Sequence, residues 1–222
     1  MRLSRTRLLP RETNVRDSRL FIVATEGQHT EKQYFEGFVS RRLRVEVLST
    51  GPDGRSSPKG VLDRLDVFRQ QYDLGTDDEL WLVVDTDQWP DWQLHEVCGA
   101  AEQRGCQLGI SNPCFELFLY LHVADADFDH PEFVALVEEA RGNRSAAMER
   151  WLRLRLADQG GYQKTRVRFE RFRHGISDAI RRARALDLAP EERWPTTFPA
   201  THVYRLVDRL YPLLSPGPWE PR

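Results

Sequence analysis

The sequence predicts an α/β protein with a four-stranded, mainly parallel sheet flanked by helices, followed by a mostly helical C-terminal half. Two observations predict this class. Short apolar segments alternate with helical patterns up to about residue 124, and helical patterns dominate the rest of the 222-residue chain. Strict alternation of strands and helices is typical of a parallel sheet covered by helices. A chain of this length has room for one domain with a sizeable core, or for a domain with a helical appendage.

Four segments have the strand pattern, because each is short, apolar and bounded by turn residues or polar residues. They are residues 19–25, 45–50, 79–85 and 106–110. Apolar residues at helical spacing predict the helices between them, at about residues 30–42, 61–74 and 92–103. Thr30 and Gln33 have the spacing of a capping box for the first of these helices. Asn112 and Pro113 have the pattern of an N-cap and first helical residue for a fourth helix that is apolar nearly all round.

The chain divides into three parts on this basis. Residues 1–18 form a basic N-terminal arm, residues 19–125 form the α/β core, and residues 126–222 form a helical region packed on the core or extending it. The helices of this last region are expected at residues 130–141, 145–158, 167–187 and 198–214.

Charge is distributed unevenly although the net charge is only −2. Between Asp73 and Gln103 the chain has nine acidic residues and no lysine or arginine, whereas the N-terminal arm and residues 144–184 are rich in arginine. An acidic centre with basic flanks suits a cation site that acts on a polyanion. The alternative, that these arginines lie on solvated helix faces, stays open.

The three cysteines, Cys98, Cys106 and Cys114, form no metal-binding or disulfide pattern, so we expect reduced thiols. No apolar run approaches the ~20 residues that cross a bilayer. The basic N-terminus lacks the apolar stretch of a secretory signal. We therefore expect a cytoplasmic protein without a membrane partner.

Three acidic residues follow strands of the predicted sheet. Glu26 follows the first strand, and Asp85 and Asp87 end the third, in the segment "LWLVVDTDQW". If the first strand lies between the second and the third, the three carboxylates meet at the edge where parallel sheets bind ligands. Mg²⁺ prefers such oxygen ligands, and residues i and i+2 of a strand face the same way. The alternative is that a lone D-x-D is an ordinary polar strand end.

Two further acids are candidates for the same site. Glu31 lies in the first turn of a helix, where the helix dipole alone accounts for a carboxylate. Glu116 lies in the apolar segment "CFELFLYLH", where a buried carboxylate needs a partner or a metal ion. A pair with an arginine and a role in the site are equally open for Glu116.

Three stretches of the chain resemble the RloB-like proteins of the Toprim superfamily. "FIVATEGQHTEKQYF" is similar to the opening motif of that family, "LWLVVDTD" to its aspartate-bearing strand and "ISNPCFELFLYLH" to its most distinctive segment. The resemblance covers about residues 20–125, and "GYQKT" at residues 161–165 resembles a further motif. It implies a Toprim-like, Rossmann-like fold.

The resemblance also implies site roles. Glu26 corresponds to the glutamate that acts as general acid or base, Asp85 and Asp87 to the metal-binding aspartates, and Glu116 to an extra acid near a second metal. The implied cofactor is Mg²⁺ or Mn²⁺. The implied function is a nuclease in bacterial defence against phage, with a co-encoded ATPase as partner. DNA or RNA as substrate, and a homo-oligomer, are left open.

Basic residues near these motifs are candidates for nucleic-acid contact. They are Lys59, Lys164, Arg166, Arg168 and Arg171, with Arg173 close by. For the lysines, a solvated position on a loop is an open alternative.

Other polar and aromatic residues have weaker claims to the site. Trp89 and Trp92 follow the D-x-D and are suited to stacking on a base or to packing on the next helix. His122, like Asn112, is a secondary candidate whose plain alternative is a buried, hydrogen-bonded side chain.

Two other enzyme classes fit less well. A D-x-D phosphatase or phosphotransferase needs an aspartate nucleophile after the first strand, where this chain has Glu26. A topoisomerase or primase needs further domains. A Toprim-like module that is catalytically silent and regulates an ATPase remains the main alternative.

Overall fold

A computed structural model describes residues 18–51 and 56–214, so the arginine-rich arm, apart from Arg19, and part of the loop before Lys59 lie outside the described residues. The sheet has five strands in the order β2-β1-β3-β4-β5. These are β1 (Arg19–Thr25), β2 (Leu43–Leu48), β3 (Glu79–Asp85), β4 (Gln107–Asn112) and β5 (Ala200–Thr201). The first four strands are parallel, and β5 pairs antiparallel with the end of β4.

The expectation of four strands is wrong by one. β5 lies inside residues 198–214, which were expected to form a helix. Its two residues are too few to give a strand pattern, and they are paired only because the chain returns to the edge of β4. The expected position of β1 between β2 and β3 is confirmed.

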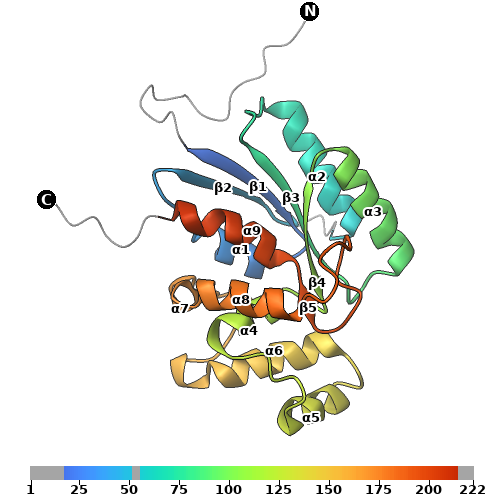
Figure 1. The fold of residues 1–222 in the computed structure, drawn as a ribbon, viewed down its shortest axis with the longest axis vertical. Coiled ribbons are helices and arrows are strands. Elements are labelled where there is room, and N and C mark those ends of the chain that lie inside the picture. The colour runs from blue at the N-terminus through green and yellow to red at the C-terminus, as the bar shows by residue number, and fades with distance from the viewer. Residues whose placement is uncertain (1–17, 52–55, 215–222) are drawn as a thin grey trace, which may run out of the picture.

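Helices cover both faces of the sheet (Figure 1). The helices α2 (Pro58–Gln71) and α3 (Asp91–Gln103) lie on one face. The other face is covered by α1 (Thr30–Phe35), α4 (Glu116–Val123) and α9 (Val203–Leu210). Because both faces are buried, the central strands are apolar throughout, and their side chains point alternately into two cores. In β1, Phe21 and Val23 join the α1 and α4 side, while Ile22 and Ala24 join the α2 and α3 side.

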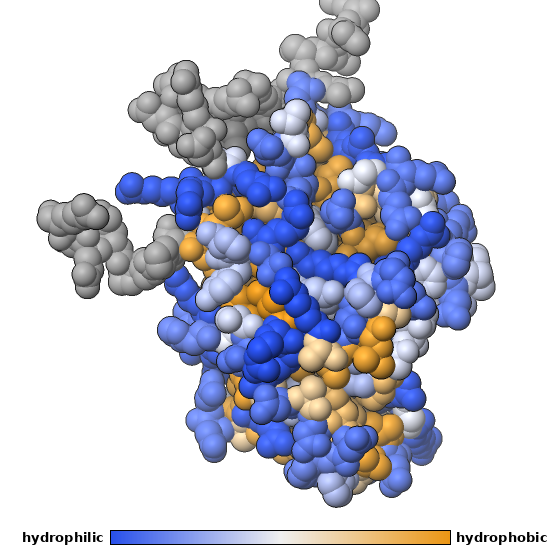
Figure 2. All heavy atoms as spheres, viewed as in Figure 1, coloured by the Kyte–Doolittle hydropathy of each residue, from blue (hydrophilic) through white to orange (hydrophobic). Residues whose placement is uncertain are grey.

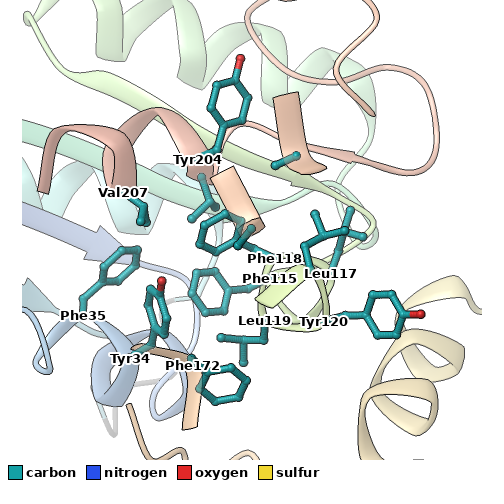
Figure 3. Packing of buried hydrophobic residues seen from close by; sticks show 14 of the residues in the cluster. Tyr34, Phe35, Phe115, Leu117, Phe118, Leu119, Tyr120, Phe172, Tyr204 and Val207 are labelled. Carbon is teal, nitrogen blue, oxygen red and sulfur yellow. The ribbon is translucent and has the colours of Figure 1, made fainter. Parts of the chain in front are cut away.

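The helix α4 is the centre of the larger core. All of its residues from Glu116 to His122 are buried, as its apolar sequence predicted. Figure 3 shows Phe115 and Phe118 close to Tyr34 of α1, and the Tyr34 ring meets both edge-on, with centroids 5.5 and 6.1 Å apart. Such aromatic contacts add about 0.5–1.5 kcal/mol each to the burial of apolar area.

The remaining helices are shorter than expected. They are α5 (Pro131–Glu139), α6 (Arg144–Arg155), α7 (Glu170–Arg173) and α8 (Ile176–Leu186), and short 3-10 turns follow α6 and α9. Of these helices, α6, α7 and α8 pack on α4, and α5 packs on α6. The single helix expected at residues 167–187 is broken before Ile176. At Gly175 the backbone touches the carbonyl group of His122, so that a Cβ atom would collide with it. This close approach lets α7 and α8 both pack on α4.

Two expected helix caps are wrong, and both sets of side chains have other partners. Thr30 and Gln33 make no capping box; Thr30 Oγ1 lies 3.2 Å from the Tyr162 hydroxyl, and Gln33 Oε1 accepts a hydrogen bond from Val167 N at 2.8 Å. Asn112 ends β4 and precedes a cis peptide bond to Pro113, and Phe115 is the residue before α4. The polar side chains that predicted caps therefore join distant parts of the chain.

Polar residues cover most of the surface seen in Figure 2, with smaller apolar patches between them. No helix within the described ranges is long and apolar enough to span a membrane. The three cysteines are free, buried thiols.

Candidate functional site

The structure brings Glu26, Asp85 and Asp87 together at the carboxyl ends of β1 and β3. Glu26 N donates to the Val83 carbonyl at 3.1 Å, which extends the pairing of the two strands by one residue. The carboxylate of Glu26 then turns toward β3, where Oε2 accepts a hydrogen bond from Asp85 N at 3.2 Å. The strand order therefore places the three acids at one edge, as the sequence predicted.

These carboxylates are crowded, and the pKa of each is raised. Burial raises the pKa of Glu26, the charges of Asp87 and Glu31 add to the rise and two hydrogen bonds work against it, which together bring the pKa to about 7. Burial also raises the pKa of Asp85 well above its ordinary value, as do the charges of Glu26, Glu31, Glu116 and Asp87. Burial raises the pKa of Asp87 as well, although the Ser145 hydroxyl offsets part of that rise. Binding a proton or a cation stabilises carboxylates that are crowded in this way.

Glu31 belongs to the same cluster, although the helix dipole alone explained it in the sequence. Its side chain is buried, and burial raises its pKa to about 7. Glu31 Oε1 accepts a hydrogen bond from Gly27 N at 3.0 Å. A Cβ atom at position 27 would collide with the Glu31 carboxylate, so only glycine allows this approach. The Glu-Gly pair after β1 thus fixes two acids of the cluster.

Glu116 is almost fully buried and has found partners other than an arginine. Its Oε1 accepts a hydrogen bond from the Tyr162 hydroxyl at 2.8 Å and lies 3.4 Å from Lys164 Nζ. Burial alone would lower the pKa of Lys164, but the carboxylates of Glu116 and Glu149 raise it above its ordinary value. Both partners come from the "GYQKT" segment, which therefore completes the site.

Two residues of the site, both on α6, escaped the sequence analysis. Glu149 Oε2 lies 3.3 Å from Lys164 Nζ. The Ser145 hydroxyl has no hydrogen-bond partner among the described residues, but it lies close enough to the Asp87 carboxylate to lower its pKa. Ser145 and Glu149 are four residues apart, so they share one face of the helix. That spacing was visible in the sequence, but the packing of α6 against α4 was not.

The backbone around Glu26 is held by residues that the sequence analysis also missed. Thr50 Oγ1 donates to the Glu26 carbonyl at 2.7 Å, and Arg64 of α2 donates from Nε to the Leu48 carbonyl at 3.1 Å. A second nitrogen of Arg64 donates to the Thr25 carbonyl. Arg64 thereby fastens the ends of β1 and β2 side by side, which fixes the direction in which Glu26 leaves the sheet.

The carboxylate of Asp85 has no partner. Within residues 18–51 and 56–214, no hydrogen bond or ion pair reaches it. The cluster supplies the hard oxygen ligands that Mg²⁺ and Mn²⁺ prefer, and the pKa of Asp85 favours an added positive charge, so the donor set fits a divalent cation. In the same ranges, no three His, Cys, Asp or Glu side chains form a metal-holding group as they stand. Several carboxylate oxygens accept hydrogen bonds instead, so ion binding requires side chains to turn.

Trp89 belongs to the site and not only to the fold. Its indole Nε1 donates to Glu26 Oε1 at 3.0 Å, so both oxygens of Glu26 have a donor. Trp92, one turn into α3, is 64% exposed. The two tryptophans are thus separated: one touches the acid cluster and the other faces solvent.

The other secondary candidates lie outside the cluster. His122 Nε2 lies 2.9 Å from the Tyr34 hydroxyl and its Nδ1 lies 2.8 Å from the Phe118 carbonyl, while burial lowers its pKa to about 4. It is a neutral core histidine that donates from Nδ1 and accepts at Nε2. Asn112 donates from Nδ2 to the carbonyl groups of Pro195 and Thr196, and so ties β4 to the loop before β5.

The basic candidates are only partly near the acids. Arg166 and Arg168 are exposed and follow Lys164 directly. Arg171 donates to the Gly161 carbonyl at 2.8 Å, which makes it a support of the "GYQKT" segment. Lys59 is exposed in the first turn of α2, and among the described residues no contact joins it to the carboxylates.

A protein-family model, described as RloB-like protein, matches residues 21–210. The match includes β5 and most of the helical half as well as the motif-bearing strands, so the chain belongs to the RloB-like family over nearly its whole length. No curated protein and no solved structure matches the chain.

Proposed function

We propose that this RloB-like protein is a divalent-cation-dependent nuclease of the Toprim type that hydrolyses phosphodiesters of DNA or RNA. We further propose that it is the effector of a bacterial anti-phage system and works with an ATPase partner. The observation that carries the proposal is the unpaired Asp85 carboxylate beside Glu26 and Asp87 at the carboxyl edge of the sheet. A half-buried carboxylate that is crowded by like charges and has no partner is costly, and an enzyme keeps one where a cation has to bind.

Asp85 and Asp87 are the residues that would hold Mg²⁺ or Mn²⁺. A bound cation would supply positive charge for the phosphate and would make a water molecule more acidic. The field of five neighbouring carboxylates favours that charge: Glu26, Glu31, Asp85, Asp87 and Glu116.

Glu26 is suited to accept a proton, because its pKa of about 7 leaves it partly ionised at neutral pH. Water attacks the phosphorus atom and passes a proton to Glu26, while the bond from phosphorus to the leaving oxygen breaks and that oxygen takes a proton from solvent. Trp89 and the Asp85 amide orient the Glu26 carboxylate during this step. Arg166, Arg168 and Lys59 are available for contacts with the phosphate backbone.

One observation favours a second candidate function, a catalytically silent module that regulates an ATPase. Glu26, Glu31 and Glu116 all accept hydrogen bonds within the protein, so part of the cluster is satisfied without a metal ion. In that case the acids serve the fold or a partner, and no cleavage occurs.

The experiment that separates the two is nucleic-acid cleavage with Mg²⁺ or Mn²⁺. The wild type is compared with the double variant Asp85→Ala/Asp87→Ala on DNA and RNA, with and without the co-encoded ATPase. We expect cleavage by the wild type alone. If both proteins are equally inert in every combination, the nuclease proposal is wrong.

A further inference from the structure

Four acids of the site form two halves, which differ in whether a lysine neutralises them. The first half, Asp85 and Asp87, has no ion pair with a lysine or arginine in the part of the chain that the structure describes. The second half, Glu116 and Glu149, shares one ammonium group: Lys164 Nζ lies 3.4 Å from Glu116 Oε1 and 3.3 Å from Glu149 Oε2. A positive charge is therefore already built into one half of the cluster.

The position of Lys164 is fixed by the segment that carries it. Thr30 Oγ1 donates to the Lys164 carbonyl at 3.4 Å, and Val167 N donates to Gln33 Oε1 at 2.8 Å, so the segment is fastened to α1 at the lysine and three residues after it. Two residues earlier, the Tyr162 hydroxyl donates to the same Glu116 oxygen that Lys164 faces.

The acceptors around the ammonium group are fixed as well. Glu149 Oε1 accepts a hydrogen bond from Arg153 at 2.9 Å, which leaves Oε2 for the lysine. The lysine and both of its carboxylates therefore have anchored positions.

We propose that the Lys164 ammonium group occupies the place of a second cation, so that the site binds one divalent ion, at Asp85 and Asp87. This inference rests on the proposed function, because it concerns how many ions that site takes. Nucleases with two ions hold them about 4 Å apart, with acids on both sides and the phosphate between them. Here Lys164 already neutralises the acids of the second side, Glu116 and Glu149.

An ammonium group is chemically suited to this place. It carries one full charge and three N–H donors. Glu116 and Glu149 face two of these donors, and the side chain is about half exposed, with 52% of its area accessible, so a third donor is free for a phosphate oxygen. Lys164 thereby offers a phosphate what a second ion would offer, a positive charge and a direct contact.

The test is the number of Mn²⁺ ions that each chain binds, measured by calorimetry at neutral pH without nucleic acid. Lys164→Met removes the charge and keeps the length of the side chain. Lys32→Met is the matched control, because the Lys32 side chain is 44% accessible, close to the 52% of Lys164, and pairs only loosely with Glu36, at 3.9 Å. Thermal unfolding of all three proteins checks that they are folded, and Lys164→Gln replaces Lys164→Met if the latter is not.

We expect one ion for the wild type, one for Lys32→Met and two for Lys164→Met, whose freed Glu116 and Glu149 take the second. Electron paramagnetic resonance of the wild type adds a readout that needs no variant, because a single Mn²⁺ gives the spectrum of an isolated ion and two neighbouring ions give a spin-coupled one. Two ions in the wild type overturn the inference and leave the nuclease proposal standing, as does one ion in Lys164→Met. A wild type that binds no ion refutes the metal site of the proposed function itself.

Discussion

Glu79 and Asp85 begin and end the same strand, β3, and their surroundings are opposite. Glu79 accepts hydrogen bonds from Arg19 at 2.7 Å, Arg209 at 2.9 Å and the Trp81 indole at 3.0 Å. Asp85 receives no donor to its carboxylate in the described residues, and burial and the acids around it raise its pKa. At one end of the strand, arginines of the chain neutralise Glu79. At the other end, the described residues supply no partner for the Asp85 carboxylate.

The difference separates structural acids from functional ones without reference to conservation. A carboxylate with arginine partners stabilises the native state, because its removal leaves those partners unpaired. A carboxylate crowded by like charges destabilises the metal-free native state, and its removal relieves repulsion. The two ends of β3 should therefore respond to substitution in opposite ways.

The largest expected effect is on catalysis by Asp85→Asn. Nucleic-acid cleavage should fall by about 100-fold or more, since loss of a ligand should exceed the 10–100-fold effects of residues that only support ligands. The free energy of unfolding without metal should stay the same or rise, because one carboxylate crowded by like charges is gone. Cleavage assays and chemical denaturation measure the two quantities on the same preparations.

Glu79→Gln is the matched control at the other end of the strand. It should keep its activity and lose about 1 kcal/mol of stability, the scale of partly exposed ion pairs. The proposed difference between the two ends of β3 is wrong if Asp85→Asn is as destabilising as Glu79→Gln, or if both variants cleave like the wild type.

Trp89→Phe should weaken Mn²⁺ binding by about 10–100-fold, because the indole that orients Glu26 is lost while the aromatic ring remains. Trp92→Phe is the control on the neighbouring exposed tryptophan and should bind Mn²⁺ like the wild type. Calorimetry provides both affinities. Equal affinities for all three proteins would show that Trp89 serves the fold alone.

The stability of the metal-free protein should fall as the pH rises from about 6.5 to 8. Glu26 and Glu31 have a pKa of about 7 in the folded chain against 4.5 ordinarily, so the native state holds more protons than the unfolded state up to that pH. By linkage, the free energy of unfolding then decreases with pH, by roughly 1 kcal/mol for each group over this window. Denaturation at several pH values in a chelator measures the slope.

His122 acts in the opposite direction between about pH 4 and 6.5. Its folded pKa of about 4 means that the unfolded state holds more protons there, which offsets the contribution of one of the two glutamates but not of both. Glu26→Gln isolates the contribution of Glu26, since it should make the decrease of stability with pH shallower from about pH 4.5 to 8. A slope that is the same in both proteins would contradict the raised pKa of Glu26.

The smallest expected effect is that of Arg166→Ala/Arg168→Ala on nucleic-acid binding. Two lost phosphate contacts should weaken binding several-fold on all sequences and reduce the salt slope by about 1.4–1.8. Arg181→Ala, on the exposed face of α8, is the control and should leave both unchanged. Fluorescence anisotropy at several salt concentrations measures this, in the Asp85→Asn background to prevent cleavage.

The sequence predicted the part of the site that depends on strands. Apolar strands and the positions of Glu26, Asp85 and Asp87 after them are local properties, and the place of β1 between β2 and β3 agrees with general rules of parallel sheets. The rest depended on long-range contacts. Lys164 and Tyr162 lie far along the chain from Glu116, and Ser145 and Glu149 became part of the site only through the packing of α6. The polar side chains of Thr30, Gln33 and Asn112 looked like helix caps because short-range patterns do not reveal a distant partner.

The most direct test of the site is a crystal structure of the protein soaked with Mn²⁺, with anomalous diffraction recorded near the manganese edge. The ion should appear between the carboxylates of Asp85 and Asp87, within reach of Glu26, and Lys164 should remain between Glu116 and Glu149. An anomalous peak elsewhere on the chain, or none at this edge of the sheet at saturating Mn²⁺, would contradict the assignment of these acids as a metal centre.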